Sequence, residues 1–316
     1  MSGASVVLAE GPLPGPAFAQ LANVELAGRP LGEHVVAPRP DVGALIALGG
    51  AVDAALLDRL PNLRVVARFG VGYDAVDVAA CSERGVQVAI TPGPVEDATA
   101  ELTVALILAL RRRVLAADRL VRGGGWSSPV TAAPSERGIH DATIGFVGFG
   151  RIARRVALAT AALGATILYT ARNRVAEEVE ATVGARRVAL AELCASSDVV
   201  TVHCPLTDAT RGLIGARELA LMRDGAALVN TARGPIVDEA ALVAQVVAGR
   251  LEAALDVFAH EPDVPLGLRA SRHVVLSPHV GSATRSAREQ MTRICVENVR
   301  AALAGERAPH LVPEQA

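Results

Sequence analysis

The stretch that decides the fold is Thr143–Ala157, which reads TIGFVGFGRIARRVA. Its first part, Ile144–Val147, is an uninterrupted apolar run of the kind that forms a buried strand. Directly after this run come Gly148 and Gly150, and Ala153 completes a G-x-G-x-x-G/A pattern. An alanine-rich helical segment follows, so the stretch predicts a strand, a tight turn and a helix in that order.

Each small residue in this pattern has a geometric role. Gly148 allows the chain to turn sharply out of the strand, and Gly150 lets a pyrophosphate approach the backbone because it has no Cβ atom. Ala153 lets the helix pack closely on the strand, and the helix N-terminus offers N–H groups and positive dipole charge. A second apolar run, Ala165–Tyr169, follows at the expected distance. We therefore interpret the stretch as a dinucleotide-binding βαβ unit; the alternative is a glycine-rich turn without a ligand.

Length and composition limit the class of protein. The chain has 316 residues, which suits two domains, and 51% of them are hydrophobic, which is enough for sizeable cores. A net charge of −2 gives no indication of nucleic-acid binding. Cys81, Cys194, Cys204 and Cys295 lack metal-ligand spacing, so we expect a reduced, cytoplasmic protein without a metal site. No apolar run approaches the ~20 residues of a membrane span, and the N-terminus lacks a secretory signal pattern.

The order of apolar runs along the chain predicts two α/β domains. Before residue 99, short strands alternate with helical segments but no glycine fingerprint occurs, which indicates a smaller, flavodoxin-like domain. From Thr143 onward the alternation is regular, as in a doubly wound parallel sheet of Rossmann type. The amphipathic helix Thr284–Leu303 returns to the first domain, so we expect one domain of residues 1–98 plus 284–316 and another of residues 99–283. The predicted strands are Val6–Ala9, Ala44–Leu48, Val65–Phe69, Val86–Ala89, Ile144–Val147, Thr166–Tyr169, Val199–His203, Ala226–Asn230, Ala253–Val257 and Val274–Leu276, and the predicted helices include Leu56–Leu60, Val76–Ser82 and Val95–Arg113.

Three chemically active residues follow predicted strands of the larger domain. Arg233, Glu261 and His279 each lie a few residues beyond a strand end. Because parallel strands end at one edge of a sheet, where ligands bind, these side chains are expected to be neighbours. An arginine holds a carboxylate and polarises a carbonyl, a histidine donates a proton near neutral pH, and a carboxylate beside it favours the imidazolium. Together they favour hydride transfer between a nicotinamide cofactor and a small 2-keto acid.

Each of these residues also has an ordinary structural alternative. Arg233 could be a surface ion-pair partner, Glu261 a loop acid before a proline, and His279 a turn histidine. His260, next to Glu261, is a rival proton donor, although flanking charge favours its solvation. The position of all three residues at strand ends favours the functional interpretation.

Two other segments also carry candidate chemistry. His203 and Cys204 could form a nucleophilic pair, but adjacent strand residues point to opposite faces, so we interpret this segment as lining the adenine side of the cofactor. The loop Phe69–Asp74 follows a strand and could present N–H groups to an anion, or it could be a simple glycine turn. Arg68 beside it could serve a phosphorylated substrate or lie at the surface.

Five motifs occur in order along the chain: VGFGRIA, HCPLT, NTARG, LDVF-x-x-EP and SPHVGS. In this combination the sequence resembles the D-isomer-specific 2-hydroxyacid dehydrogenases over nearly its whole length. The resemblance implies a substrate domain and a dinucleotide-binding domain, and it places Arg233, Glu261 and His279 at the catalytic positions. Val71, Gly72 and Arg233 then bind the substrate. The expected cofactor-binding residues are Gly148, Gly150, Arg151, Ile152, Thr170, Arg172, His203, Cys204, Pro205, Thr210, Thr231, Ala232, Asp256, His279 and Gly281.

The segment YTARNR, residues 169–174, departs from NAD-preferring relatives. These carry an acid at the position of Thr170, which binds the ribose hydroxyls. No acid here repels a 2′-phosphate, and Arg172 could bind one bidentately. We therefore expect NADP as the preferred cofactor, with NAD possible. A second departure is Ala259, which replaces the first glutamate of Phe-Glu-x-Glu-Pro and leaves Glu261 as the candidate acid.

The resemblance also bears on assembly and substrate. The family is usually dimeric, and the segment from Leu106 to Trp126 corresponds to its dimer arm, so a homodimer is expected. In some glyoxylate and hydroxypyruvate reductases of the family, a tryptophan like Trp126 reaches the partner's active site. The expected activity is reduction of such a small 2-keto acid to the D-2-hydroxy acid. Two alternatives stay open: a phosphoglycerate dehydrogenase-like enzyme, and a non-enzymatic dinucleotide-sensing regulator.

Overall fold

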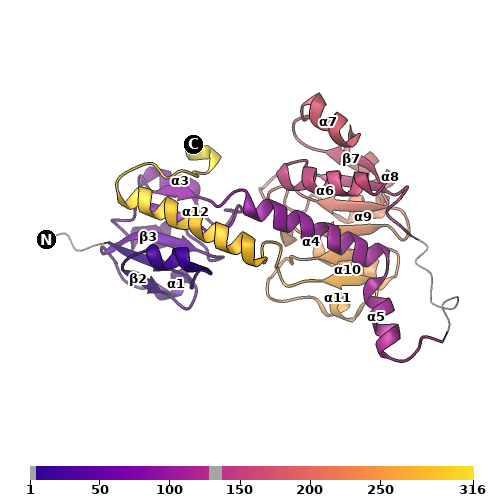
Figure 1. The fold of residues 1–316 in the computed structure, drawn as a ribbon, viewed down its shortest axis with the longest axis horizontal. Helices are drawn as coiled ribbons and strands as arrows, with labels where there is room; N and C mark the ends of the chain where they lie inside the picture. The colour runs from indigo at the N-terminus through magenta and orange to yellow at the C-terminus, as the bar shows by residue number, and fades with distance from the viewer. Residues whose placement is uncertain (1–4, 128–136) are drawn as a thin grey trace. The chain divides into compact units, whose positions relative to one another are not determined.

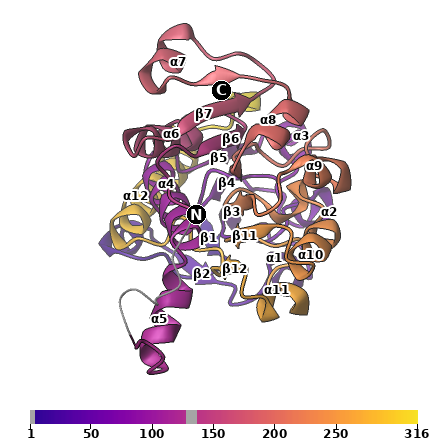
Figure 2. The ribbon, with the colours of Figure 1, turned by 90° about the vertical axis from the view of Figure 1, so that its right-hand side faces the viewer.

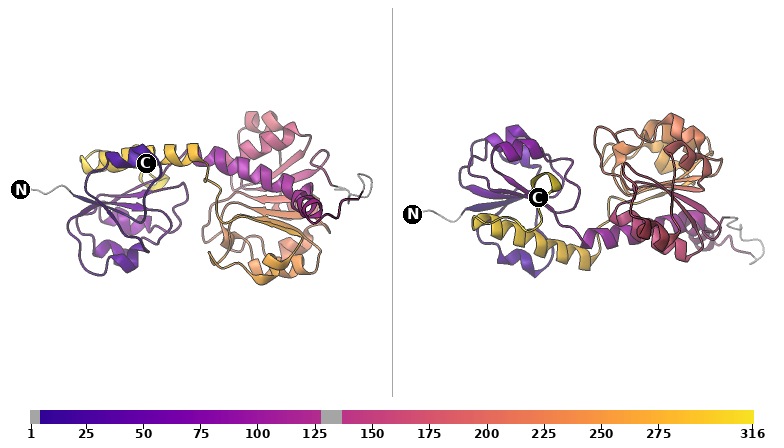
Figure 3. Two further views of the ribbon diagram at one scale, coloured as in Figure 1. Left: turned by 60° about the horizontal axis from the view of Figure 1, so that its bottom comes forward. Right: turned by 90° about the horizontal axis from the view of Figure 1, so that it is seen from above.

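The computed structural model describes residues 5–127 and 137–316 (Figure 1). The chain divides into two compact units. Unit 1 comprises Met1–Ala98 and Ser282–Ala316, and unit 2 comprises Thr99–Gly281. Each unit is a parallel β-sheet with helices on both faces, which Figure 3 shows from two sides. The predicted α/β class with two Rossmann-like sheets is therefore confirmed.

Unit 1 contains a five-stranded parallel sheet in the order β2-β1-β3-β4-β5, which is the order of flavodoxin-like folds. All six residues of β3 are buried, because helices cover both faces of the sheet. The carboxylates of Asp53 and Asp77 cap the first turns of two of these helices. The strands are β1 (Val6–Ala9), β2 (Val24–Leu26), β3 (Val42–Ala47), β4 (Val65–Arg68) and β5 (Gln87–Ala89).

Helices from both ends of the chain contribute to the core of unit 1. Helices α1, α2 and α3 pack on one face of the sheet. Helix α12, drawn in yellow in Figure 1, packs on the other face together with the 3₁₀ helix η1. The bounds are α1 (Leu31–His34), α2 (Ala54–Asp58), α3 (Val78–Glu83), α12 (Arg285–Leu303), η1 (Pro16–Gln20) and, near the C-terminus, η3 (Pro313–Gln315).

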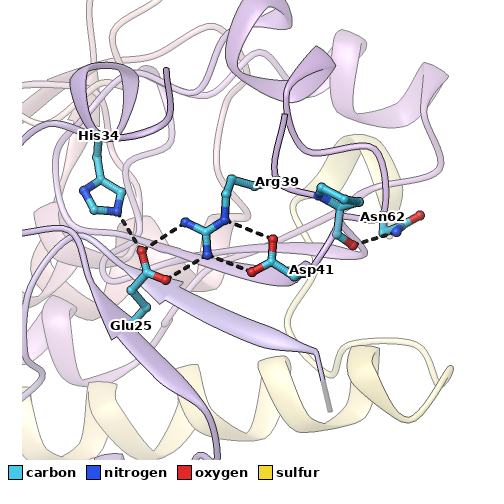
Figure 4. Close-up of polar contacts among 6 residues, drawn as sticks. Glu25, His34, Arg39, Asp41 and Asn62 are labelled. Atoms are coloured by element: carbon cyan, nitrogen blue, oxygen red, sulfur yellow. Dashed lines mark hydrogen bonds and ion pairs between the residues drawn. The ribbon is translucent and has the colours of Figure 1, made fainter. Parts of the chain in front are cut away.

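An ion-pair network holds the edge strand β2 of unit 1 (Figure 4). Glu25 on this strand accepts hydrogen bonds from His34 Nε2 (2.8 Å) and from Arg39 Nη1 (3.0 Å) and Nη2 (2.8 Å). Arg39 also donates from Nε to Asp41 Oδ1 at 2.9 Å. The hydrogen bonds from Arg39 and His34 lower the pKa of Glu25 to about 2. Charged side chains at an edge strand also oppose pairing with another chain.

Unit 2 contains a seven-stranded parallel sheet in the order β12-β11-β10-β9-β6-β7-β8. The chain begins at the inner strand β6 and winds outward in both directions, so the sheet is doubly wound as predicted. The strand order reverses between β6 and β9, which is where such sheets bind ligands. The strands are β6 (Thr143–Val147), β7 (Thr166–Thr170), β8 (Arg186–Arg187), β9 (Val199–Val202), β10 (Ala227–Asn230), β11 (Glu252–Leu255) and β12 (Val274–Leu276).

Two apolar layers cover the sheet of unit 2. Helices α4, α6 and α7 form one layer, and α8 to α11 form the other (Figure 2). The chain enters this unit along α4, which contains the boundary between residues 98 and 99. The bounds are α4 (Pro94–Arg111), α5 (Val114–Arg122), α6 (Arg151–Ala162), α7 (Glu177–Val183), α8 (Leu190–Ser196), α9 (Ala216–Leu221), η2 (Gly234–Ile236), α10 (Glu239–Val247) and α11 (Leu266–Ala270).

The sequence pattern missed short or irregular elements. Strand β2 has no fully buried residue, and β8 consists of two exposed arginines, so neither shows a strand-like apolar run. The helix predicted over Val95–Arg113 ends at Arg111, and Arg113 adopts a left-handed conformation (φ 51°) before α5 begins. In the described ranges 5–127 and 137–316, no helix has both the length and the apolarity needed to cross a bilayer.

Candidate active site

The turn between β6 and α6 brings two loops of the sheet edge together. Gly148 has φ +91°, a conformation that side-chain-bearing residues rarely adopt. A Cβ atom there would lie 2.6 Å from Cys204 N and 2.8 Å from His203 C, so only glycine lets the β6 turn approach the loop after β9. The backbone is fixed on its other side by a hydrogen bond from Gly148 N–H to the Thr170 carbonyl (2.8 Å).

The start of α6 has the features of a pyrophosphate site. Gly150 is the N-cap, and a Cβ atom built on it meets nothing within 4 Å, so the backbone is open to an approaching ligand. Arg151 is the first helical residue and is exposed, Ile152 is half-buried, and Ala153 is fully buried against the sheet. Since the first N–H groups of a helix have no intrahelical acceptor, this end fits a dinucleotide phosphate.

The end of β7 carries several arginines. Thr170 and Arg174 line a surface groove together with Arg187 and Glu192. Arg174 donates to Glu180 from Nε (3.0 Å) and Nη2 (2.7 Å), whereas Arg187 Nη2 donates to the carbonyls of Ala171 (2.8 Å) and Arg172 (3.2 Å). Arg172 itself is exposed. The loop is therefore positively charged and is held in place through its own backbone.

The loop after β9 does not form a nucleophilic pair. His203 stacks on Phe146 with ring centroids 5.6 Å apart, and its Nε2 is hydrogen-bonded to Thr201 Oγ1 (2.9 Å). Burial lowers the pKa of His203 to about 3 and raises the pKa of the Cys204 thiol to about 11. The imidazole is therefore neutral and the thiol protonated near pH 7, which argues against thiolate chemistry.

Three further residues predicted to bind the cofactor lie near the same edge of the sheet, namely Pro205, Thr210 and Thr231. Thr210 Oγ1 donates to the Pro205 carbonyl at 2.6 Å and so closes the loop that follows β9. Thr231, directly after β10, is buried, and its hydroxyl is 2.8 Å from that of Thr103 on α4. These hydroxyls brace the loops around the site.

The loop after β10 carries Arg233. The buried Asn230 holds this loop, because its Oδ1 accepts from Ala232 N–H (3.0 Å) and its Nδ2 donates to the Arg233 carbonyl (2.9 Å). The Arg233 guanidinium donates from Nη1 to the Ala232 carbonyl at 2.7 Å. Gly234 then touches the loop after β11, since a Cβ atom there would lie 2.5 Å from Ala259 N. The arginine loop is thus in direct backbone contact with the loop that carries Glu261.

The loop after β12 is organised by Asp256, which is 1% exposed. Its Oδ1 accepts from Ser277 Oγ (2.6 Å) and Val280 N–H (2.9 Å), and its Oδ2 accepts from Gly281 N–H (2.9 Å). Its carbonyl accepts from His279 N–H at 2.8 Å. His279 has φ +53°, in the left-handed region. The four hydrogen bonds hold a backbone conformation that is otherwise unfavourable for a histidine.

Glu261 and His279 meet at this edge. His279 Nδ1 donates to Glu261 Oε2 at 2.7 Å, and Glu261 Oε1 accepts from Phe258 N–H at 3.1 Å. Burial alone would raise the pKa of Glu261, but the hydrogen bonds from His279 and Phe258 and the charge of Arg233 lower it. The pair is half-exposed, so a ligand can reach the imidazole ring. His260, by contrast, is exposed.

The predicted anion loop of unit 1 follows β4. Val71 and Gly72 are both half-buried. Arg68 donates from Nε to the Gly72 carbonyl (2.9 Å) and from Nη1 to the Ala47 carbonyl at the end of β3 (3.0 Å). The guanidinium therefore ties this loop to the neighbouring strand end.

Sequence reasoning missed the residues that hold the reactive side chains. Asn230, Gly234 and Ser277 bear no charge, so a pattern of reactive residue types does not single them out. Their signal was position, because each lies at a strand end within three residues of a candidate. In the parts of the chain that the structure describes, no group of three or more His, Cys, Asp or Glu is placed to hold a metal ion.

Comparison with known proteins decides the family. A model of the NAD-binding domain of D-isomer-specific 2-hydroxyacid dehydrogenases matches residues 104–281. The chain belongs to the D-isomer-specific 2-hydroxyacid dehydrogenase family. Its resemblance to this family, predicted from five short motifs, is thereby confirmed, and the protein is an oxidoreductase with a nicotinamide-dinucleotide-binding domain.

Individual dehydrogenases of the family support the assignment. The glyoxylate reductase of Aeropyrum pernix is 44% identical over 270 residues, which cover 83% of this chain and 79% of that protein. The glyoxylate reductase of Thermococcus litoralis is 41% identical over 278 residues, covering 86% and 84%. The NADPH-dependent glyoxylate/hydroxypyruvate reductase of Sinorhizobium meliloti, solved with NADP and malonate, has a TM-score of 0.90 at 30% identity and covers 99% of this chain and 98% of its own.

Proposed function

We propose that this dehydrogenase reduces a small 2-keto acid, of the glyoxylate or hydroxypyruvate type, to the D-2-hydroxy acid. The observation that carries the proposal is the 2.7 Å hydrogen bond between His279 and Glu261. Arg233 is close enough to Glu261 for the guanidinium charge to lower the pKa of this carboxyl group. This arrangement lies at the sheet edge that also carries the glycine turn. The named glyoxylate reductases among the relatives support this choice of substrate.

The reaction divides among three side chains. The Gly148–Ala153 turn would hold the pyrophosphate of a reduced nicotinamide dinucleotide, which would supply the hydride for the carbonyl carbon. Arg233 binds the substrate carboxylate and polarises the carbonyl through its planar guanidinium. His279, protonated on both nitrogens, donates its Nε2 proton to the developing alkoxide while Nδ1 stays hydrogen-bonded to Glu261. The Glu261 carboxylate holds the orientation of the imidazole ring. Val71 and Gly72 bind the substrate carboxylate through backbone N–H groups.

A substitution at His279 tests this assignment. His279→Asn keeps a residue type that tolerates the left-handed conformation but removes the proton donor, so kcat should fall about 10²–10⁴-fold. Dinucleotide affinity, measured by fluorescence titration, should fall much less than kcat, because His279 is only one of the expected cofactor contacts. His260→Asn, an exposed histidine on the loop after β11, is the matched control and should leave kcat unchanged.

A panel of keto acids separates this activity from the alternatives. We expect turnover of glyoxylate or hydroxypyruvate and little turnover of phosphohydroxypyruvate, because Arg68 is engaged with two backbone carbonyls. Preferential use of the phosphorylated acid would instead favour a phosphoglycerate dehydrogenase-like enzyme. A protein that binds the dinucleotide but turns over no member of the panel would favour a sensing regulator.

NADPH is the cofactor that we propose the enzyme prefers. The support is the arginine-rich end of β7, where Arg172 is exposed. Arg174 and Arg187 line the same groove as Thr170. Residues 169–174 contain no acidic side chain that would repel a 2′-phosphate. Arg172→Ala should weaken NADPH binding much more than NADH binding, by roughly tenfold or more for a lost charge-assisted contact. Arg217→Ala, an exposed arginine on α9, is the control. Equal losses for both cofactors would reject the assignment.

We also propose that the protein forms a homodimer through α5, which lies within the predicted arm Leu106–Trp126. A reduced cytoplasmic setting is proposed as well, because the four cysteines are free thiols. No residue of α5 is buried, and it exposes Val114, Leu115, Leu120 and Val121 beside an exposed Trp126. Exposed apolar patches of this kind mark interaction surfaces. Val121→Glu should convert a dimer into a monomer in analytical ultracentrifugation, whereas Arg122→Glu on the same helix should not. A wild-type monomer at micromolar concentration would contradict the proposal.

A further inference from the structure

The carboxylate of Glu239 holds the loop after β11, which carries Glu261. Glu239 is the first residue of α10, and its Oε1 accepts a hydrogen bond from Ala259 N–H at 3.0 Å. The start of α10 is capped by the neighbouring Asp238, whose Oδ1 accepts from Ala241 N–H at 3.0 Å. The two adjacent carboxylates therefore have separate tasks, one within the helix and one across to the loop.

The peptide group between Phe258 and Ala259 is held by two residues that follow Arg233 in the chain. Its N–H donates to Glu239, as described above. Gly234 lies directly against the same peptide group, since a Cβ atom on this glycine would lie 2.5 Å from Ala259 N. The segment that begins with the arginine thus fixes this peptide group by a close backbone contact and by a charge-assisted hydrogen bond.

The preceding N–H group of the loop connects this peptide group to the Glu261 carboxylate. Phe258 N–H donates to Glu261 Oε1 at 3.1 Å, and Glu261 Oε2 accepts from His279 Nδ1 at 2.7 Å. Two consecutive N–H groups of the loop are therefore bound by two carboxylates, Glu239 from α10 and Glu261 from the loop itself. Because the Glu261 side chain is partly exposed, its orientation depends strongly on where Phe258 N–H is held.

We propose that Glu239 is a positioning residue, which holds the loop so that Glu261 orients His279 for proton donation. The inference rests on the proposed function, because it assumes that His279 donates the proton to the substrate. Glu239 acts through Glu261 and takes no part in the chemistry itself. Without the Glu239 carboxylate, Ala259 N–H loses its acceptor and the loop moves relative to the imidazole ring. Small displacements of this kind lower the rate of the chemical step more than they weaken substrate binding.

Substitutions at Glu239 test the proposal in the full-length protein. In Glu239→Ala, kcat for glyoxylate should fall about tenfold, the effect of a lost charge-assisted hydrogen bond, whereas KM and dinucleotide affinity should change much less. Glu239→Gln keeps an oxygen that accepts from Ala259 N–H and should recover most of kcat. Glu177→Ala is the matched control, because it removes the exposed first residue of α7, and it should leave kcat unchanged.

Two further measurements separate positioning from a merely structural role. In a Glu261→Ala background, Glu239→Ala should lower kcat by less than about twofold more, because the carboxylate that it positions is already absent. Exchange of the Phe258 amide proton, followed by NMR, should be about tenfold faster in Glu239→Ala and close to wild type in Glu239→Gln. If Glu239→Ala does not fold, Glu239→Met keeps the length of the side chain without a strong acceptor and should give the same losses.

The outcomes distinguish this proposal from the proposed function. A folded Glu239→Ala or Glu239→Met protein with unchanged kcat would overturn the positioning role, and so would a loss of kcat that is just as large in the Glu261→Ala background. Failure of the wild type to reduce any keto acid would instead reject the proposed function. In that case the exchange of the Phe258 amide proton would still show whether Glu239 holds the loop.

Discussion

Gly234→Ala would test whether the arginine loop and the glutamate loop must touch. Gly234 has no left-handed φ, so alanine brings no backbone strain, and the only change is the added methyl group. That Cβ atom would lie 2.5 Å from Ala259 N and closer still to the Phe258 carbonyl. Real contacts of this kind do not fall below 3 Å, and both opposing groups are backbone. The two loops must therefore separate, by about 1 Å at the nearest atoms.

The size of the expected effect follows from this displacement. Crowding of a packed site costs about 1–3 kcal/mol of stability. Moving Arg233 by about 1 Å relative to Glu261 and His279 should lower kcat/KM about 100-fold, which corresponds to about 2.7 kcal/mol of transition-state stabilisation. Dinucleotide affinity should change little, because the glycine turn after β6 belongs to another strand end.

The assay combines steady-state kinetics with glyoxylate, a fluorescence titration with the dinucleotide and a thermal melt. Gly32→Ala is the matched control, because its Cβ atom meets nothing within 4 Å and its φ is not left-handed. This control should retain full activity. A Gly234→Ala protein that is folded, binds the dinucleotide and keeps kcat/KM within about threefold of wild type would refute the reasoning.

Three further predictions concern charge and protonation. In Glu261→Gln, kcat for glyoxylate should fall about tenfold or more, because a neutral amide replaces the carboxylate that accepts the charge-assisted hydrogen bond from His279 Nδ1. An unchanged kcat would count against the pairing. The four cysteines should resist a disulfide reagent at pH 7.5 until the protein is denatured, because burial raises the pKa of each thiol to about 11 or 12; rapid labelling of the native protein would contradict this. The pKa of Glu25 lies below its ordinary 4.5, so its ion-pair network stabilises the fold above pH 4.5, and this stabilisation is lost as the pH falls towards 2. Glu25→Gln should therefore lower the melting temperature by about 2–4 °C at pH 7 and by much less at pH 3. Equal shifts of the melting temperature at both pH values would contradict this prediction.

The meeting of the proposed catalytic residues at one sheet edge could be predicted, because parallel sheets impose a simple rule. Arg233, Glu261 and His279 each follow a strand, and the shared edge brings their loops together whatever their separation in sequence. The hydrogen bond between Glu261 and His279 follows from that rule and from the chemistry of the two side chains. Apolar runs likewise located the buried strands, because a strand covered on both faces is apolar throughout.

Elements without a continuous buried face were not predictable in this way. Strand β2 is held by the ion pairs of Glu25, and β8 by its neighbour β7, so their residues are not apolar. The break between α4 and α5 depends on one residue, Arg113, in a conformation that no periodic pattern signals. Contacts between side chains and loop backbone, such as those of Asn230, depend on loop shapes that only the folded chain defines.

These backbone contacts explain how the exposed pair proposed for catalysis is kept in position. The His279 and Glu261 side chains are 49% and 35% exposed, so packing alone cannot fix their positions. Buried polar groups do so instead, because Asp256 holds the backbone around His279 and Asn230 holds the loop of Arg233. Fixed loops lose little further conformational entropy when substrate binds, which favours a productive geometry from the start. Glu10 and Arg68 hold the strand ends of unit 1 through backbone groups in the same manner.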